Sequence, residues 1–316
     1  MTDALRLDSD VRCGVVMAGG SRDDVLSLSR RIETLGFDSI WAGDHISFHV
    51  PIIESITLLS FVAAATERVR LGTGVYLLPL RHPSITAKTT AALDRLSGGR
   101  LTLGVGVGGE FAPEFEATGI PLRERGSRTD ESIPLLRRLW TEDGVAHEGR
   151  HFRFAPVSLD PKPLQPGGPP IWVGGRSPAA MRRAGRLGDG YISTMTSTER
   201  YAKNLAAIEA EAAACGRAPC AFGTGALLFT VLGDAYEPAL ERAATMLGTI
   251  YRRDFREAAA RYCLLGRPED CLEQLERFVD AGCRHFTLSP LSDPSEFLER
   301  VAEGILPELR SLAPGR

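Results

Sequence analysis

The stretch Gly174-Gly175-Arg176-Ser177-Pro178 has the residue types and order of a phosphate-binding turn. It follows an apolar run at 170–173 that is typical of a buried strand, and Ser177 with Pro178 favours the start of a helix. The two glycines let a ligand approach the backbone, and the N–H groups and dipole of a helix N-terminus attract an anion. The alternative is a strand-to-helix turn that binds nothing.

His45, which follows Asp44 at the end of a predicted strand, is the strongest candidate for acid–base chemistry. An imidazole changes its charge near neutral pH, and a neighbouring carboxylate can orient the ring. Glu110, after the glycine-rich end of another predicted strand, is a second candidate. The structural alternatives are a turn cap for Asp44, a packed core histidine for His45 and a solvated loop carboxylate for Glu110.

Several other chemistries lack the residues that they require. No lysine stands at a predicted strand end, so Schiff-base catalysis has no candidate. The patterns H-x-H, H-E-x-x-H and G-x-S-x-G are absent, which argues against a metal hydrolase and against a nucleophile elbow. We therefore expect no metal site. The run Gly104-x-Gly106-x-Gly108 is followed by a loop pattern, which differs from the helix start of a dinucleotide-binding fold.

Strand-like and helix-like segments alternate along the chain. Eight short apolar strands, each followed by a helix pattern, predict a parallel (β/α)8 TIM barrel, and a doubly wound open sheet is the alternative. The predicted strands cover 11–17, 38–42, 69–76, 101–107, 171–173, 191–193, 226–232 and 285–289. In such a barrel the active site lies at the carboxyl ends of the strands, which is where His45, Glu110 and the phosphate turn stand.

The alternation continues from 1 to 316 without a linker, so we expect a single domain with insertions at the C-terminal face of the strands. A small insertion at about 141–169 is too long for an ordinary connection. A hairpin fits there around Glu148-Gly149-Arg150, as a lid, an interface element or a decoration. The segment 247–265 is a second excursion.

The ends of three predicted strands are rich in glycine: Gly72-Thr73-Gly74-Val75, Gly104 to Glu110, and Gly174-Gly175. Glycine weakens a strand and marks a bulge or a close approach of another group to the backbone. Three such ends on neighbouring strands predict a flat, extended ligand across the barrel mouth, with its phosphate at Gly174-Gly175.

Bulk properties exclude some partners. The formal charge of −3 and the isoelectric point near 6.1 give no sign of nucleic-acid binding. Met1 to Asp10 lacks the apolar core of a signal peptide, and no run is long enough to span a membrane. The six cysteines have no C-x-x-C spacing and are expected to be reduced, mostly buried thiols. We expect a cytoplasmic protein with no nucleic-acid or membrane partner.

From about Val11 to Leu312 the chain resembles the bacterial luciferase-like flavin- and deazaflavin-dependent oxidoreductases. The resemblance rests on the following motifs: Glu67-Arg68-Val69-Arg70-Leu71-Gly72-Thr73-Gly74-Val75, Arg81-His82-Pro83, Leu93-Asp94-Arg95-Leu96-Ser97-Gly98-Gly99-Arg100, Leu103-Gly104-Val105-Gly106-Val107-Gly108, Pro170-Ile171-Trp172-Val173-Gly174-Gly175 and Leu187-Gly188-Asp189-Gly190-Tyr191. Members of this family have a (β/α)8 barrel with insertions.

The resemblance implies a redox ring at the barrel mouth and a non-proline cis peptide at Gly74-Val75 behind it. It implies that His45 and Glu110 act in proton transfer and substrate positioning. The extra glycine before Glu110 leaves the alignment of this residue open. The cofactor-binding residues that it implies are Asp44, Thr73, Gly74, Val75, Gly106, Val107, Gly108, Gly174, Gly175, Arg176 and Thr194.

Trp41-x-x-Asp44-His45 resembles the branch of the family that uses coenzyme F420, a deazaflavin, and we favour it over FMN. This implies hydride transfer to or from a small organic substrate, by a homodimer. The first alternative is an FMN-dependent monooxygenase supplied with reduced flavin by a separate reductase. The second is a cofactor-binding protein without turnover. Substrate specificity is expected to lie in the loops near Phe48, Phe111 and 247–262.

Overall fold

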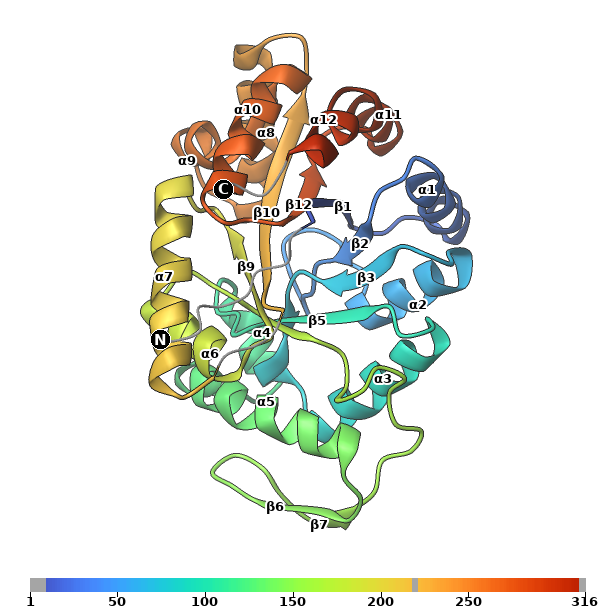
Figure 1. Ribbon diagram of the computed structural model, residues 1–316, viewed down its shortest axis with the longest axis vertical. Coiled ribbons are helices and arrows are strands. Elements are labelled where there is room, and N and C mark those ends of the chain that lie inside the picture. Colours follow the sequence, from blue (N-terminus) through green and yellow to red (C-terminus); the bar gives the residue numbers. More distant parts are fainter. Residues whose placement is uncertain (1–9, 218–220, 313–316) are drawn as a thin grey trace.

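The computed structural model describes residues 10–217 and 221–312 (Figure 1). Its strands, in chain order, are β1 (Arg12–Met17), β2 (Ser39–Ala42), β3 (Arg70–Thr73), β4 (Tyr76–Leu77), β5 (Leu101–Gly106), β6 (Val145–Glu148), β7 (Arg153–Val157), β8 (Ile171–Gly174), β9 (Gly190–Thr194), β10 (Gly223–Leu232), β11 (Leu264–Gly266) and β12 (His285–Pro290).

The helices surround these strands. They are α1 (Arg22–Thr34), α2 (Ser55–Ala65), η1 (Leu78–Leu80), α3 (Pro83–Leu96), α4 (Ala112–Ala117), η2 (Leu122–Glu124), α5 (Arg125–Thr141), α6 (Pro178–Leu187), α7 (Thr198–Ala214), α8 (Tyr236–Tyr251), α9 (Arg256–Tyr262), α10 (Pro268–Asp280), α11 (Pro294–Gly304) and α12 (Leu306–Ser311). Within residues 10–217 and 221–312 no helix combines the length and the apolar character that a bilayer crossing requires.

The sheet closes on itself. Strands β1, β2, β3, β5, β8, β9 and β10 pair in this order in parallel, and β12 pairs with both β10 and β1. This closure confirms the predicted TIM barrel and excludes the open sheet. The carboxyl ends of the strands therefore meet at one rim, and residues distant in sequence become neighbours there.

One predicted strand is interrupted. The pattern at 69–76 predicted a continuous strand, but β3 ends at Thr73 and β4 begins at Tyr76. Between them lies a cis peptide bond at Gly74-Val75, where the resemblance implied one. The Gly74 N–H still donates to the Ala42 carbonyl of β2 at 2.8 Å, so the break stays attached to the barrel wall.

Two tryptophans fill the barrel interior and explain several glycines. A Cβ at Gly72 would lie 2.3 Å from the Trp41 indole, and a Cβ at Gly223 would lie 2.1 Å from Trp172. These glycines are needed for packing. β10 begins at Gly223, three residues before the predicted start at 226, and Gly223 and Gly225 leave room there for the Trp172 indole.

His285 lies under the tryptophans, near the amino ends of the strands. Its Nε2 is 2.7 Å from the Ser39 hydroxyl oxygen and 3.3 Å from the Trp41 indole nitrogen. Burial, together with the charges of Arg12 and Arg70, lowers the pKa of His285 to about 3. The ring is therefore neutral in the folded protein.

This burial predicts a loss of stability in mild acid. The unfolded chain binds a proton at His285 below pH ~6.5, whereas the folded protein binds one only near pH ~3, so the free energy of unfolding falls as pH is lowered between these values. Between about pH 6.5 and about pH 5 the loss should be about 1.6 kcal/mol. Urea unfolding of the wild type and His285→Gln at both pH values measures it. An equal pH dependence in the two proteins would contradict the assignment.

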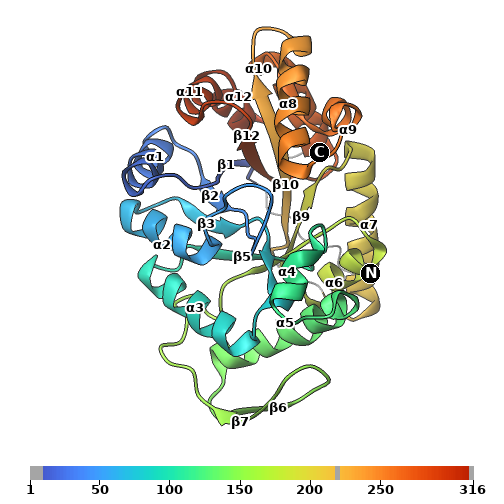
Figure 2. The ribbon, with the colours of Figure 1, turned by 180° about the vertical axis from the view of Figure 1, so that it is seen from behind.

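The expected hairpin is formed by β6 and β7, which pair antiparallel. In both views it extends beyond α3 and α5, away from the barrel (Figures 1 and 2). Glu131 of α5 holds it by accepting from the Phe152 N–H at 3.1 Å and by contacting His147 Nε2 at 2.9 Å. Because the hairpin follows a helix and packs on α5, this position favours a decoration over a lid.

Two elements absent from the predicted pattern lie in the connections after β5 and after β10. Helix α4 follows β5, and strand β11 follows α9 and pairs with the end of β10. Both were hidden in segments predicted as loop or helix, because each is short. Among the described cysteines, Cys13, Cys263, Cys271 and Cys283 are buried free thiols, and Cys215 is an exposed one; Cys220 lies outside the described residues.

Candidate active site

The predicted cofactor-binding residues and the predicted catalytic residue His45 lie on one continuous arc of the rim. Strands β2, β3, β5, β8 and β9 are neighbours in the barrel, and each contributes a predicted residue at or just after its carboxyl end. In the order of the strands these residues are Asp44 and His45; Thr73, Gly74 and Val75; Gly106, Val107 and Gly108; Gly174, Gly175 and Arg176; and Thr194. An extended ligand on this arc would reach from the histidine to the predicted phosphate turn.

The partner of His45 is Glu114 of α4, a residue that the sequence analysis did not single out. His45 Nδ1 lies 3.2 and 3.3 Å from the two carboxylate oxygens of Glu114. The Ile46 N–H also donates to this carboxylate at 3.1 Å. The Glu114 side chain is fully buried, whereas 18% of the His45 side chain is exposed. When Nδ1 carries the proton and donates to Glu114, Nε2 keeps a lone pair for a substrate.

Glu110, the carboxylate proposed from the sequence, is not the partner of His45 Nδ1. It is exposed in the bend after β5, and its charge acts on Tyr251 of α8. A readable signal existed for the helix that carries Glu114, because Pro113 and an acidic residue favour a first helical turn. Nothing in the sequence shows which of Glu110, Glu114 and Glu116 faces His45.

Asp44 has a full set of protein partners. Its carboxylate accepts two hydrogen bonds from Arg81, at 2.6 and 2.8 Å, one from the Leu77 N–H at 2.8 Å and one from the Ser55 hydroxyl at 3.2 Å. The carboxylate is fully buried. It ties the loop that carries His45 to the segment after the cis peptide, so its interactions are those of a positioning residue. A direct contact of Asp44 with the cofactor stays a prediction from the resemblance.

Val75 fills the space between two glycine-rich strand ends. A Cβ at Gly106 would lie 2.4 Å from the Val75 side chain, and a Cβ at Gly174 would lie 2.7 Å from it. A Cβ at Gly104 would meet the Thr73 carbonyl oxygen at 2.0 Å. The glycine-rich strand ends predicted room for a ligand at these positions. In the structure they make room for β3 and for Val75, which forms a half-buried apolar surface at the barrel mouth.

At the predicted phosphate turn, the N-terminus of α6 is exposed to solvent. Ser177 caps α6 by accepting from the Ala180 N–H at 3.2 Å. Arg176 is exposed, and its guanidinium reaches 3.5 Å from the Met195 carbonyl oxygen, just beyond Thr194. Gly175 has φ +136°, a value that L side chains rarely adopt. A cation, a helix N-terminus and the end of β9 therefore meet at one place, which suits an anion.

An aromatic wall, defined here as Phe48, Phe111 and Tyr251, borders His45. The Phe48 ring stacks on His45 with centroids 4.0 Å apart and planes 16° apart. Phe111 and Tyr251 each meet Phe48 edge to face at 5.9 Å. The three loops expected to set specificity are thus brought together beside the candidate base.

Comparisons with known proteins agree with this geometry. The luciferase-like monooxygenase family matches residues 9–303. The chain belongs to this family. It is 32% identical to an F420-dependent glucose-6-phosphate dehydrogenase of Beutenbergia cavernae, over 91% of this chain and 94% of the relative. It is 31% identical to an F420-dependent hydroxymycolic acid dehydrogenase of Mycobacterium tuberculosis, over 91% of this chain and 85% of the relative.

Solved structures of luciferase-like proteins share the fold. An F420-dependent secondary alcohol dehydrogenase in complex with an F420-acetone adduct superimposes with a TM-score of 0.85 at 22% identity, over 95% of this chain and 99% of the other. The monooxygenase RslO1 from Streptomyces bottropensis gives a TM-score of 0.82 at 27% identity, over 94% and 99%. The solved structures that share the fold of this luciferase-like chain thus include one named as F420-dependent and one named as a monooxygenase.

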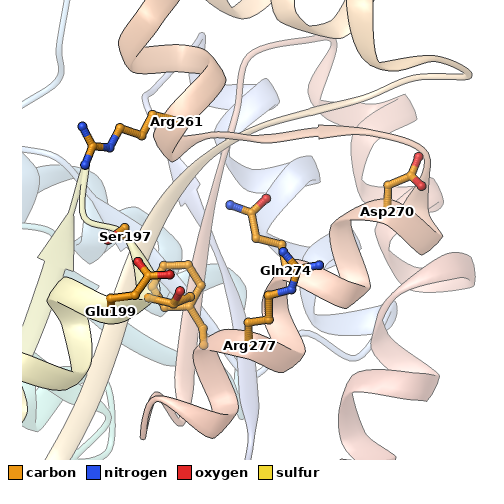
Figure 3. A pocket seen from close by; sticks show the side chains of 8 residues that line it. Ser197, Glu199, Arg261, Asp270, Gln274 and Arg277 are labelled. Carbon is orange, nitrogen blue, oxygen red and sulfur yellow. The ribbon is translucent and has the colours of Figure 1, made fainter.

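Two other hollows of this luciferase-like barrel lie away from His45. A polar groove of about 250 Å³ is bordered by Glu199 of α7, Arg261 of α9 and Arg277 of α10 (Figure 3). A cavity of about 580 Å³ lies at the amino ends of the strands, beside Trp172 and His285. No cluster of His, Cys, Asp and Glu in the described part of the chain could hold a metal ion.

Proposed function

We propose that the chain is a coenzyme F420-dependent oxidoreductase that transfers hydride to or from a small organic substrate. The observation that carries the proposal is the His45–Glu114 pair on the same arc of the rim as the phosphate turn. Relatives with 31–32% identity, named as F420-dependent dehydrogenases, support the choice of the deazaflavin. The presence of a buried, paired acid–base group argues against a binding protein without turnover.

The residues at the rim suit this cofactor. Arg176 and the N-terminus of α6 would hold its phosphate, because a cation and helix N–H groups stabilise an anion. Val75 would support the ring with an apolar surface. The resemblance to the family also implies roles for Thr73, Gly108 and Thr194, which lie on the same arc.

Bound oxidised deazaflavin supplies a hydride acceptor, and the chain's own residues handle the proton. His45 Nε2 would accept the hydroxyl proton of an alcohol, because Nδ1 is engaged with Glu114. The Glu114 carboxylate would stabilise the imidazolium that forms and fix the orientation of the ring. Phe48 covers one face of the imidazole and limits the access of water to it.

Anaerobic turnover tests the proposal. The protein, oxidised F420 and a panel of sugar phosphates and primary and secondary alcohols are incubated under nitrogen, and the loss of oxidised F420 is followed by absorbance. We expect reduction without oxygen and without a second protein. Product formation only with reduced FMN, oxygen and a separate reductase would support the monooxygenase alternative and overturn the proposal.

Replacing Glu114 distinguishes its role from that of Glu110, the carboxylate proposed from the sequence. Glu114→Gln keeps the shape of the side chain but removes the charge that faces His45, and we expect kcat to fall about 10- to 100-fold. Glu110→Gln is the matched control and should change kcat less than about threefold. Steady-state kinetics of both variants at saturating F420 gives the comparison. The reverse order would assign the catalytic role to Glu110.

Replacing Arg176 tests the phosphate turn. Arg176→Glu places a negative charge beside the proposed phosphate, so we expect about tenfold weaker F420 binding, a modest value because the side chain is exposed. Arg182→Glu, exposed one turn further along α6, is the control and should bind F420 within about twofold of the wild type. Gly175→Asp is a poorer test, because its Cβ would lie 2.8 Å from the Ala180 Cβ at a strained φ. Equal weakening by both charge reversals would place the phosphate elsewhere.

Two further expectations are kept as proposals. Phe61 on α2 and Ile85 and Leu96 on α3 expose large apolar side chains on neighbouring helices, which supports a homodimer that covers this face. A cytoplasmic location is consistent with free cysteines and with a diffusible cofactor. A separate reductase belongs only to the FMN alternative.

A further inference from the structure

We infer that this enzyme acts on alcohols, or the matching carbonyl compounds, that carry an aromatic or other bulky apolar group, and not on sugar phosphates. This inference rests on the proposed function, because it concerns the substrate side of the same site. It starts from the position of His45 Nε2, the atom that must meet the reacting hydroxyl. The groups around that position decide which substituents can accompany the hydroxyl.

The surroundings of His45 are aromatic. Phe48 covers one face of the imidazole at 4.0 Å, and Glu114 occupies its Nδ1 side. Behind Phe48 stand Phe111 and Tyr251, each edge-on at 5.9 Å. A substrate that reaches Nε2 therefore meets ring faces and edges, which favour contact with an apolar or aromatic group.

The wall continues through Phe229 toward the predicted position of the cofactor ring. Tyr251 meets Phe229 of β10 edge-on at 6.5 Å. Phe229 and Val75 both pack on the apolar cluster of the barrel interior. The burial of Tyr251 raises the pKa of its hydroxyl to about 12, so the group stays neutral. An uncharged substituent would thus lie between the cofactor ring and the wall without loss of hydration of a charged group.

Two arginines near the wall, Arg253 and Arg176, are already engaged with other groups. The Arg253 guanidinium lies over Phe255 at 4.7 Å and over Tyr251 at 6.0 Å, where it covers the rings. Arg176, which also acts on Tyr251, is already proposed for the cofactor phosphate. Glu110 adds a negative charge on the same side. A sugar phosphate would need cations or helix N–H groups of its own.

The test compares substrates under anaerobic conditions with purified protein and F420. We expect kcat/KM for 1-phenylethanol to exceed that for glucose 6-phosphate by about 100-fold or more, because the wall contacts the ring and offers no phosphate site. Acetophenone with reduced F420 measures the reverse direction. Equal or faster turnover of glucose 6-phosphate would overturn the inference, and so would F420 binding without turnover of either aromatic compound. A failure of F420 to bind would instead overturn the proposed function.

Variants of Tyr251 assign the effect to the ring. Tyr251→Ala should raise KM for 1-phenylethanol about tenfold, while propan-2-ol, which lacks a ring, should change less than about threefold. Tyr251→Phe keeps the ring and should restore the wild-type KM. Tyr236→Ala, an exposed tyrosine at the start of the same helix α8, is the control for an unrelated aromatic deletion. If Tyr251→Phe were as impaired as Tyr251→Ala, the tyrosine hydroxyl and not the ring would be the group that binds the substrate, which would contradict an apolar wall. F420 affinity, measured for each variant, shows that the fold is intact.

Discussion

His45→Ala should lower kcat by about 100- to 10,000-fold, the range expected when a positioned acid–base group is lost. The hydroxyl proton then has no acceptor beside the reacting carbon, because Glu114 is buried behind the imidazole. F420 affinity should change much less, since the proposed cofactor contacts come from Val75, Arg176 and backbone groups. Steady-state kinetics and a fluorescence titration of the variant with F420 measure the two quantities separately.

The structural alternative for His45 gives the opposite pattern. If the imidazole only packs against Phe48, the variant should lose thermal stability but keep its turnover per active site. A well-folded His45→Ala protein with wild-type kcat and an unaltered pH–rate profile would remove His45 from the mechanism. His49→Ala is a suitable control, because His49 is a neighbouring imidazole whose ring centroid lies 4.7 Å from that of Phe111 in the aromatic wall.

Asp44→Ala should lower the free energy of unfolding by about 3–5 kcal/mol, because it leaves the Arg81 guanidinium buried without its main partner. Glu54, 3.8 Å from Arg81, offsets only part of the loss. The Leu77 N–H also loses its acceptor. Urea unfolding measures the difference from the wild type.

The double variant Asp44→Ala/Arg81→Ala checks the cause. It should be less destabilised than the sum of the two single variants, because neither charge is then left buried and unpaired. Asp44→Asn separates the alternatives for this residue. A variant of unchanged stability that has lost F420 affinity would support the direct cofactor contact implied by the family resemblance, against the positioning role.

The barrel could be predicted because its signals are local. Apolar strands and amphipathic helices alternate, and helix starts such as Ser177-Pro178 are marked in the sequence. The errors lie where a non-local contact decides the conformation. Gly223 lies in β10 at a position where any side chain would collide with Trp172. Strand β3 ends before Val75, whose side chain fills the space left by glycines of the neighbouring strands β5 and β8.

The site was predicted in part, for a related physical reason. Strand ends converge in a barrel, so the sequence could place His45, Val75 and Arg176 on one rim. The pairing of His45 with Glu114 depends on helix α4, and this helix is too short to be recognised from the periodicity of its apolar residues. Hence Glu114 was missed, and the sequence instead offered Glu110, which is exposed.

The most direct test of the account is the choice of cofactor by the wild-type protein. Equilibrium titrations with F420 and with FMN are followed by cofactor or protein fluorescence. Both cofactors would place a phosphate at the same turn, but they differ in the redox ring and in the tail. The account predicts that F420 binds at least about tenfold more tightly than FMN, a difference of about 1.4 kcal/mol or more. FMN binding as tight as or tighter than F420 would contradict it.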